Sequence, residues 1–196
     1  CYALTDINAC TNFSDLEMAV FYGCSALEDI SPLKDSNNLT EVDLYNAPVE
    51  DISALKDKTT ITILNIGNTN TIKNNKDSTY EVLKSLTSVT RLGVRSAYVD
   101  DEAFEVICNM TNLKSLDLYD NDVSDISSIT KLTNLSTVDI SGNEICDFSP
   151  LSSLTNLKGH TVSVSGVSRQ SIDIQGCERT ITNPFVGMDG NPVIPL

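Results

Sequence analysis

The sequence predicts an α/β solenoid, in which each repeat adds one short strand to a parallel sheet and a helical turn to the opposite side. Two observations predict this fold. An apolar-x-x-apolar-x-apolar pattern recurs at intervals of about 22 residues, and a second motif, of the type Asp-Ile-Ser-Pro-Leu, follows it in several repeats. A unit this short cannot bury its own apolar side chains, so neighbouring units must stack into one column.

The strands are predicted from a Thr-Asn-Leu marker, which occurs at 111–113, 133–135 and 155–157. Each marker opens the apolar pattern, whose last part has the two-residue period of a strand. This alignment predicts that Leu116 and Leu118 are buried between repeats. It predicts seven or eight strands, with apolar starts at Phe13, Leu39, Ile61, Val89, Leu113, Leu135 and Leu157.

The second motif predicts the helical side of the solenoid. It reads LEDISPL at 27–33, VEDISAL at 49–55, VSDISSI at 123–129 and ICDFSPL at 145–151. Its aspartate can accept backbone N–H bonds and its proline fits a first helical turn. We therefore expect a short helical turn after each of Asp29, Asp51, Asp125 and Asp147.

Two middle repeats are longer and predict true helices. Residues 77–89 and 99–110 place apolar side chains at helical spacing, with Asp or Ser near their starts. The sequence thus predicts longer helices only near 78–86 and 100–108, on the convex side.

The chain divides into a repeat domain at 1–164, with about seven repeats and a partial first one, and a C-terminal segment at 165–196. Because the chain opens within a repeat, we expect further repeats or a cap upstream. The C-terminal segment loses the leucine pattern and alternates apolar residues with turn residues such as Met-Asp-Gly-Asn-Pro. It predicts a β-rich C-terminal cap.

Composition and charge disfavour several classes of partner and activity. The chain has 13 basic and 27 acidic residues and a net charge of −14, which disfavours nucleic acid and anionic lipid as partners. No stretch reaches the ~18 apolar residues of a membrane-spanning helix, so we expect no direct membrane insertion. His160 is the only histidine and falls at an expected core-strand position. We therefore expect no enzymatic activity, no catalytic residue, no metal site and no cofactor.

The pattern L-x-x-L-x-L-x-x-N-x-I, joined to the Asp-Ile-Ser-Pro-Leu motif, resembles the leucine-rich repeat, and its 22-residue form is similar to the bacterial internalin subclass over residues 4–164. The resemblance implies a leucine-rich-repeat horseshoe. It also implies a cell-surface or secreted adhesion module that binds a protein or glycan through its concave sheet. The alternative is an intracellular leucine-rich-repeat scaffold or regulatory subunit, although such proteins end in a helical cap.

The same resemblance implies an asparagine ladder at the ninth repeat position. Asn121 and Asn143 supply it, whereas Ala47, Thr69 and Ala97 interrupt it in the middle repeats. It also places Cys10 where a core leucine usually stands, as a small packed side chain. Six cysteines occur without metal-ligand spacing, and a Cys1–Cys24 disulfide is one option that the repeat geometry allows.

The strand positions between the apolar ones face outward and supply the candidate ligand-binding residues. The predicted fifth column holds Glu17, Asp43, Asn65, Gly93, Asp117, Asp139 and Thr161, and the seventh holds Ala19, Tyr45, Gly67, Arg95, Tyr119, Ser141 and Ser163. Two glycines beside tyrosine and arginine predict a low spot with binding anchors. Alternatively, the arginines only neutralise neighbouring aspartates. The candidate set is Tyr45, Ile63, Gly67, Arg91, Gly93, Arg95, Asp117 and Tyr119.

Overall fold

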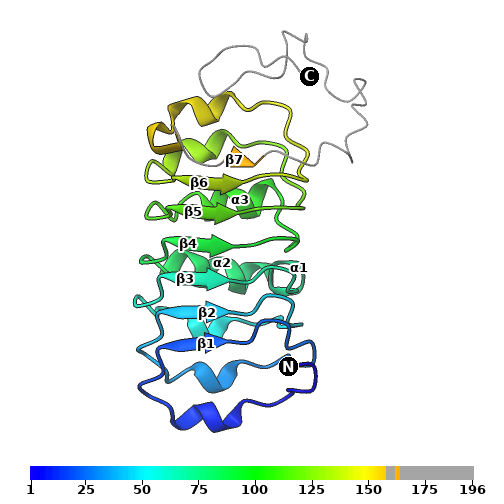
Figure 1. The fold of residues 1–196 in the computed structure, drawn as a ribbon, viewed down its shortest axis with the longest axis vertical. Helices are drawn as coiled ribbons and strands as arrows, with labels where there is room; N and C mark the ends of the chain where they lie inside the picture. Colours follow the sequence, from blue (N-terminus) through cyan, green and yellow to red (C-terminus); the bar gives the residue numbers. More distant parts are fainter. Residues whose placement is uncertain (158–161, 164–196) are drawn as a thin grey trace.

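The computed structural model describes residues 1–157 and a strand at 162–163. These residues form one elongated solenoid whose strands stack in sequence order from the N-terminal end (Figure 1). Every neighbouring pair is parallel, which confirms the predicted sheet. The strands are β1 (Met18–Val20), β2 (Glu41–Asp43), β3 (Ile63–Asn65), β4 (Arg91–Gly93), β5 (Ser115–Asp117), β6 (Thr137–Asp139) and β7 (Val162–Ser163).

The core is a continuous column of aliphatic side chains beneath the sheet. The middle residue of each of the first six strands is buried, while the flanking residues are partly or fully exposed. Leu116 and Leu118 are 1% and 0% exposed, which confirms their predicted burial. Stacking of neighbouring repeats thus supplies the burial that one repeat lacks.

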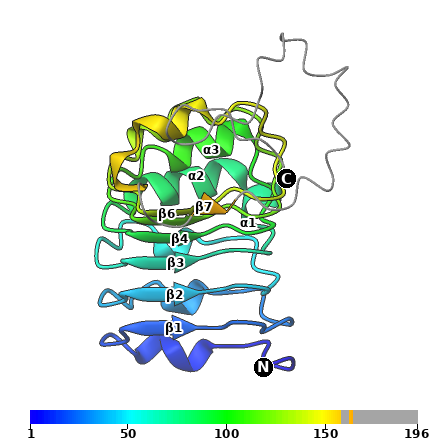
Figure 2. The ribbon, with the colours of Figure 1, turned by 45° about the horizontal axis from the view of Figure 1, so that its top comes forward.

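Helices cover the side of the sheet opposite its open face (Figure 2). The two expected longer helices are present as α2 (Lys76–Ser85) and α3 (Asp101–Ile107), preceded by the single turn α1 (Thr71–Asn74). The other repeats use 3-10 turns, as the shorter motif predicts. These turns are η1 (Asn8–Asn12), η2 (Ser31–Leu33), η3 (Ser53–Leu55), η4 (Ser127–Lys131), η5 (Ser149–Ser153) and η6 (Thr155–Leu157).

The motif aspartates start these turns as predicted. Asp29 Oδ1 accepts the N–H of Ser31 at 2.7 Å, and its second oxygen accepts the Ser31 hydroxyl at 3.0 Å. Asp51 makes the same pair of bonds to Ser53. Asp125 and Asp147 likewise each accept the backbone N–H of the serine two residues later.

The asparagine ladder is confirmed where the sequence supplies it. Buried Asn121 accepts the N–H groups of Ala97 and Val99, each at 3.0 Å, and donates to three backbone carbonyls. Asn143 continues the ladder by accepting from Val123. In one of the interrupted repeats a buried hydroxyl pair stands where the amide would be: Thr69 Oγ1 lies 3.1 Å from Thr71 Oγ1 and donates to the Ile66 carbonyl.

Two further ladders were not predicted, and they explain why the Thr-Asn-Leu marker recurs. The marker asparagines donate their side-chain amides to backbone carbonyls of the preceding repeat. Just before the strands, hydroxyl groups do the same. The amide donors are Asn38, Asn112, Asn134 and Asn156, and the hydroxyl donors are Thr40, Thr62, Thr90 and Ser136.

The predicted alignment of the first repeat is wrong by three residues. Ala19 pairs with Val42, so Leu16 opens the apolar pattern and Phe13 does not. Ala19 is accordingly buried at 2% exposure, Phe13 is 51% exposed, and Glu17 precedes the strand. The cause is that two apolar residues three positions apart satisfy the same spacing rule, and a small core alanine gives a weak apolar signal.

The last strand is also shifted. Val162 pairs with Val138, so it lies five positions after Leu157, whereas the matching strand residue lies three positions after the opening residue in the preceding repeats. The register therefore places Ser163 beside Asp139, at the fifth repeat position and not at the seventh. The predicted β-rich cap at 165–196 and His160 lie outside the described residues.

Candidate ligand-binding surface

The outward residues of the strands form one surface, which we call the sheet face. Three rows of side chains cross the strands, and the strand register defines them from β1 to β6. The first row is Met18, Glu41, Ile63, Arg91, Ser115 and Thr137, the second is Val20, Asp43, Asn65, Gly93, Asp117 and Asp139, and the third is Tyr22, Tyr45, Gly67, Arg95, Tyr119 and Ser141. Ser141 departs from the predicted outward position, because it is only 2% exposed.

The third row is held at its end by a turn that repeats in every unit. The residue after each third-row position has a positive φ, between 49° and 70°. Side chains there also bond across repeats, since Asn68 donates to Asn46 at 2.7 Å and Ser96 donates to Asp120 at 3.0 Å. The backbone beneath the tyrosines and Arg95 is therefore fixed by hydrogen bonds along the row.

On β4 and β5 the structure brings three predicted site residues together. Arg95 Nε lies 3.4 Å from Asp117 Oδ2, and the guanidinium lies 4.5 Å from the centre of the Tyr119 ring. Asp117 Oδ1 also accepts the N–H of Tyr119 at 3.1 Å. Both charged side chains are about 40% exposed, so water screens the ion pair and it contributes only ~0–1 kcal/mol.

The two glycines do not form the open low spot that the sequence predicts. A Cβ atom on Gly67 would lie 2.9 Å from Tyr45 Cδ2, and one on Gly93 would lie 2.7 Å from Asn65 Oδ1. The glycines thus make room for the Tyr45 ring and the Asn65 amide, whose atoms occupy the space above them. Tyr45 is held over the sheet by this contact, and any larger residue at 67 would displace it.

Arg91 behaves differently from Arg95. It is exposed in the first row, between Ile63 and Ser115. Among the described residues no carboxylate lies within ion-pair distance of its guanidinium. Charge neutralisation by a neighbouring aspartate is therefore observed for Arg95 but not for Arg91.

The alignment error concealed the most apolar part of the sheet face. The three side chains that β1 and the residues just after it contribute to the sheet face are apolar or aromatic and exposed, with Met18 at 55%, Val20 at 50% and Tyr22 at 62%. Tyr22 stacks on Tyr45 with ring centres 5.2 Å apart and planes at 16°. A signal was present in the sequence, because a large apolar residue precedes tyrosine at 21–22, 44–45 and 118–119.

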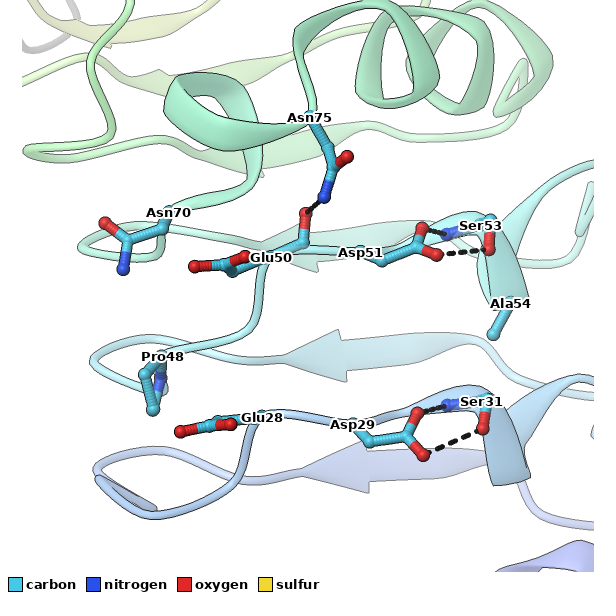
Figure 3. Close-up of a pocket in the computed structure, with 10 residues that line it drawn as sticks. All are labelled: Glu28, Asp29, Ser31, Pro48, Glu50, Asp51, Ser53, Ala54, Asn70 and Asn75. Atoms are coloured by element: carbon cyan, nitrogen blue, oxygen red, sulfur yellow. Dashed lines mark hydrogen bonds between the residues drawn. The ribbon is translucent and has the colours of Figure 1, made fainter.

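A groove of about 510 Å³ lies away from the sheet face, beside the first two motif turns (Figure 3). Three of its four carboxylates already have structural partners: Asp29 and Asp51 hold their serines, and Glu50 accepts from Asn74 at 2.6 Å. Asn75 crosses one side of the groove to donate to the Glu50 carbonyl at 3.0 Å. Its acidic residues are thus explained by the repeat motif.

The described residues offer little for catalysis. Within them, no three His, Cys, Asp or Glu side chains are placed to hold a metal ion. Burial raises the pKa of the Cys108 thiol to about 12, which keeps it protonated and unreactive at neutral pH. Cys24 Sγ lies 3.6 Å from the Cys1 amino nitrogen, and both thiols are free. Cys10 packs partly buried against the core, as predicted.

None of the helices in the described part of the chain is both long and apolar enough to cross a bilayer.

Comparisons with known proteins agree with this geometry. The family model for leucine-rich repeats in two copies matches residues 111–158. No curated protein gives a significant match. Among solved structures, an internalin InlF from Listeria monocytogenes is 28% identical, with a TM-score of 0.62, and the match covers 70% of this chain. This chain corresponds to only 38% of the length of that internalin.

Two further structures share the fold. An internalin C2 from Listeria monocytogenes is 24% identical with a TM-score of 0.57, covering 74% of this chain and 71% of its own. A leucine-rich-repeat protein from Leptospira interrogans is 18% identical with a TM-score of 0.67, and the match covers 83% of this chain and 40% of that protein. The parallel sheet, the motif turns and these likenesses together show a leucine-rich-repeat fold that is similar to the fold of the bacterial internalins.

Proposed function

We propose that this chain is a non-enzymatic binding module that recognises a protein through the sheet face, the concave side of the horseshoe. Solenoids of this kind use such extended surfaces for binding. The likeness to internalins favours a role at a bacterial cell surface or in a secreted protein.

The observation that carries the proposal is where exposed apolar side chains gather. Seven large hydrophobic side chains are exposed in the described residues, and four of them are outward residues of the sheet. Exposed apolar groups that gather on one surface mark interaction sites. The four are Met18, Val20, Tyr22 and Tyr119.

The predicted site residues have assigned roles in this proposal. Tyr45, Ile63, Arg91 and Tyr119 contact the partner directly. Gly67 and Gly93 give Tyr45 and Asn65 their positions, and Asp117 holds Arg95 against Tyr119. Aromatic and arginine side chains are the commonest energetic anchors in protein interfaces.

A matched pair of substitutions tests the proposal. Ser115 is half-buried in the middle of the sheet face and Ser78 is exposed on α2, and neither hydroxyl has a hydrogen bond among those resolved in the described residues. Peptides selected on the wild-type protein from a displayed random library serve as the probe. Ser115→Arg should weaken their binding at least tenfold, whereas Ser78→Arg should leave it unchanged. Loss with Ser78→Arg alone would place binding on the helical side and refute the proposal.

A further inference from the structure

The N-terminal part of the sheet face has a composition that selects for the chemistry of its partner. We infer that β1 and β2 together bind a protein segment that presents an aliphatic or aromatic side chain next to a lysine or arginine. This inference rests on the proposed function and specifies its partner. It concerns Met18, Val20 and Tyr22 on β1 and Glu41, Asp43 and Tyr45 on β2, which we call the apolar-acidic patch.

The apolar half of the patch is largely exposed. Met18, Val20 and Tyr22 are each exposed by half or more, although Ala19 and Cys24 in the same repeat are buried. β1 is the first strand of the sheet, and it pairs only with β2. Burying these side chains against a ligand gains about 25 cal/mol per Å² of apolar surface.

The tyrosine stack makes the patch rigid. Tyr22 stacks on Tyr45 at 5.2 Å, and Tyr45 in turn rests against the backbone at Gly67. Aromatic rings that are already fixed lose little conformational entropy on binding. The patch therefore presents two preorganised rings beside the aliphatic side chains.

The acidic half lies directly against the apolar half. The strand register places Glu41 beside Met18 and Asp43 beside Val20. Both carboxylates are half-buried, and within the described residues neither forms an ion pair. One carboxylate oxygen of Asp43 accepts the Tyr45 N–H at 2.9 Å, and its other oxygen can accept a bond from a ligand. A cation placed next to the apolar contact would meet both carboxylates.

The charges argue against a second copy of this chain as the occupant. A symmetric dimer through this patch would bring the acidic rows of two copies together, and each copy carries a net charge of −14. Like charges juxtaposed in an interface cost several kcal/mol. A partner with its own basic residues gains from the same field.

A glycan fits the patch less well than a protein. Tyrosine rings stack on sugars, but Met18 and Val20 provide no hydrogen-bond donor or acceptor. Sugar hydroxyls buried against them would lose bonds to water without replacement. The β1 row therefore favours an apolar side chain over a sugar ring.

The experiment selects displayed random peptides on the wild-type protein and measures the affinity of the enriched peptides by fluorescence polarisation. The inference expects enriched peptides to combine large apolar residues with Lys or Arg. Val20→Ser and Tyr22→Ala should each weaken binding at least tenfold. The control is Tyr98→Ala, at an exposed tyrosine away from the sheet, and it should leave binding unchanged.

The acidic contribution has a closely matched control. Asp43 and Asp139 occupy the same outward row, and each accepts the N–H two residues further on, at 2.9 and 3.0 Å. Asparagine keeps that acceptor. Asp43→Asn should weaken binding and reduce its dependence on salt concentration, whereas Asp139→Asn should change neither.

Other outcomes would overturn the inference. Enrichment of acidic peptides, or equal losses with Asp43→Asn and Asp139→Asn, would exclude the basic partner. Binding lost with Arg91→Glu but kept with Tyr22→Ala would refute the patch while leaving the sheet face as the binding surface. A dimer in sedimentation that Val20→Lys converts to monomer would make a second copy the occupant. Retention on a glycan array that Tyr22→Ala abolishes, with no peptide enriched, would assign the patch to sugars.

Discussion

The N-terminal end of the sheet face and its β4–β5 region each carry an exposed tyrosine, but in different surroundings. On β4 and β5, Arg95, Asp117 and Tyr119 satisfy one another through an ion pair, a cation–π contact and a backbone hydrogen bond. At β1, Val20 and Tyr22 are exposed, and Tyr22 stacks on Tyr45 and makes no cation–π contact within the described residues. A side chain's availability for a ligand therefore depends on its cross-strand neighbours as much as on its type.

This contrast is confined to the surface. The side chains beneath both ends belong to one apolar column, in which Leu64 and Leu116 are 0% and 1% exposed. Differences between the ends should thus appear in binding experiments, while core substitutions should damage both ends similarly.

The largest expected effect tests that common column. Leu116→Ala removes a fully buried side chain between repeats and should lower the free energy of unfolding by ~2–5 kcal/mol. Leu64→Ala, under the N-terminal half, should cost a similar amount. Thermal and denaturant unfolding measure both. A wild-type melting temperature for either variant would show that the two ends do not share one core.

The next largest effect concerns the asparagine ladder, which is present near β5 and absent near β2. Asn121 satisfies two buried N–H groups near β5, whereas Ala47 and Thr69 stand at the matching positions nearer β2. Asn121→Ala leaves those groups without partners, at about 1–3 kcal/mol each. The surface amide of Asn112, with a single bond to the Thr87 carbonyl, provides the control. Asn112→Ala should cost clearly less in chemical unfolding, and equal losses would contradict the ladder's role.

A smaller effect depends on pH and concerns the helix behind β4 and β5. Partial burial alone would raise the pKa of Asp101, but hydrogen bonds from the Asp125 and Ser124 N–H groups and the Ser124 hydroxyl outweigh it, and the pKa is lowered. A lowered carboxyl pKa stabilises the fold above the unfolded value of about 4, and this contribution is lost as pH falls through the folded value.

Asp101→Asn should therefore lower the melting temperature at pH 7, and the difference from wild type should shrink below about pH 4. Ser78→Asn, on the neighbouring helix, serves as a control with no such trend. A difference that stays constant from pH 7 to pH 3 would show that the charge of Asp101 contributes nothing.

The smallest effect concerns the partnered cluster itself. A double-mutant cycle with Arg95→Ala and Asp117→Ala should give a coupling free energy below ~1 kcal/mol, because both side chains are well exposed. High salt should reduce it further. A coupling of several kcal/mol would mean that the cluster is a structural element and not a surface contact.

Much of the fold could be predicted from the sequence because apolar spacing is repeated, and errors in one repeat are corrected by the next. The parallel sheet, the turns after Asp29 and Asp51, and helices α2 and α3 all followed from such patterns. The first repeat was misplaced because it has a neighbour on one side only, and Ala19 provides little apolar signal.

The candidate site was less predictable, because residue types do not reveal side-chain partners. Gly67 and Gly93 predicted empty space, yet Tyr45 and Asn65 fill it. The row of exposed side chains on β1 was missed entirely, since its register depended on the misaligned repeat. Register is a property of the assembled sheet, and a shift along the strand changes which residues face outward.

Photo-crosslinking tests the central claim, that ligands bind the sheet face and most strongly at its unpartnered end, most directly. Benzoylphenylalanine replaces one tyrosine at a time, at Tyr22, Tyr119 or Tyr98, which are exposed by 62%, 37% and 47%. With the selected peptides, the account predicts the highest crosslinking yield at Tyr22, a lower yield at Tyr119 and none at Tyr98. Crosslinks at Tyr98 without any from the two sheet positions would contradict it.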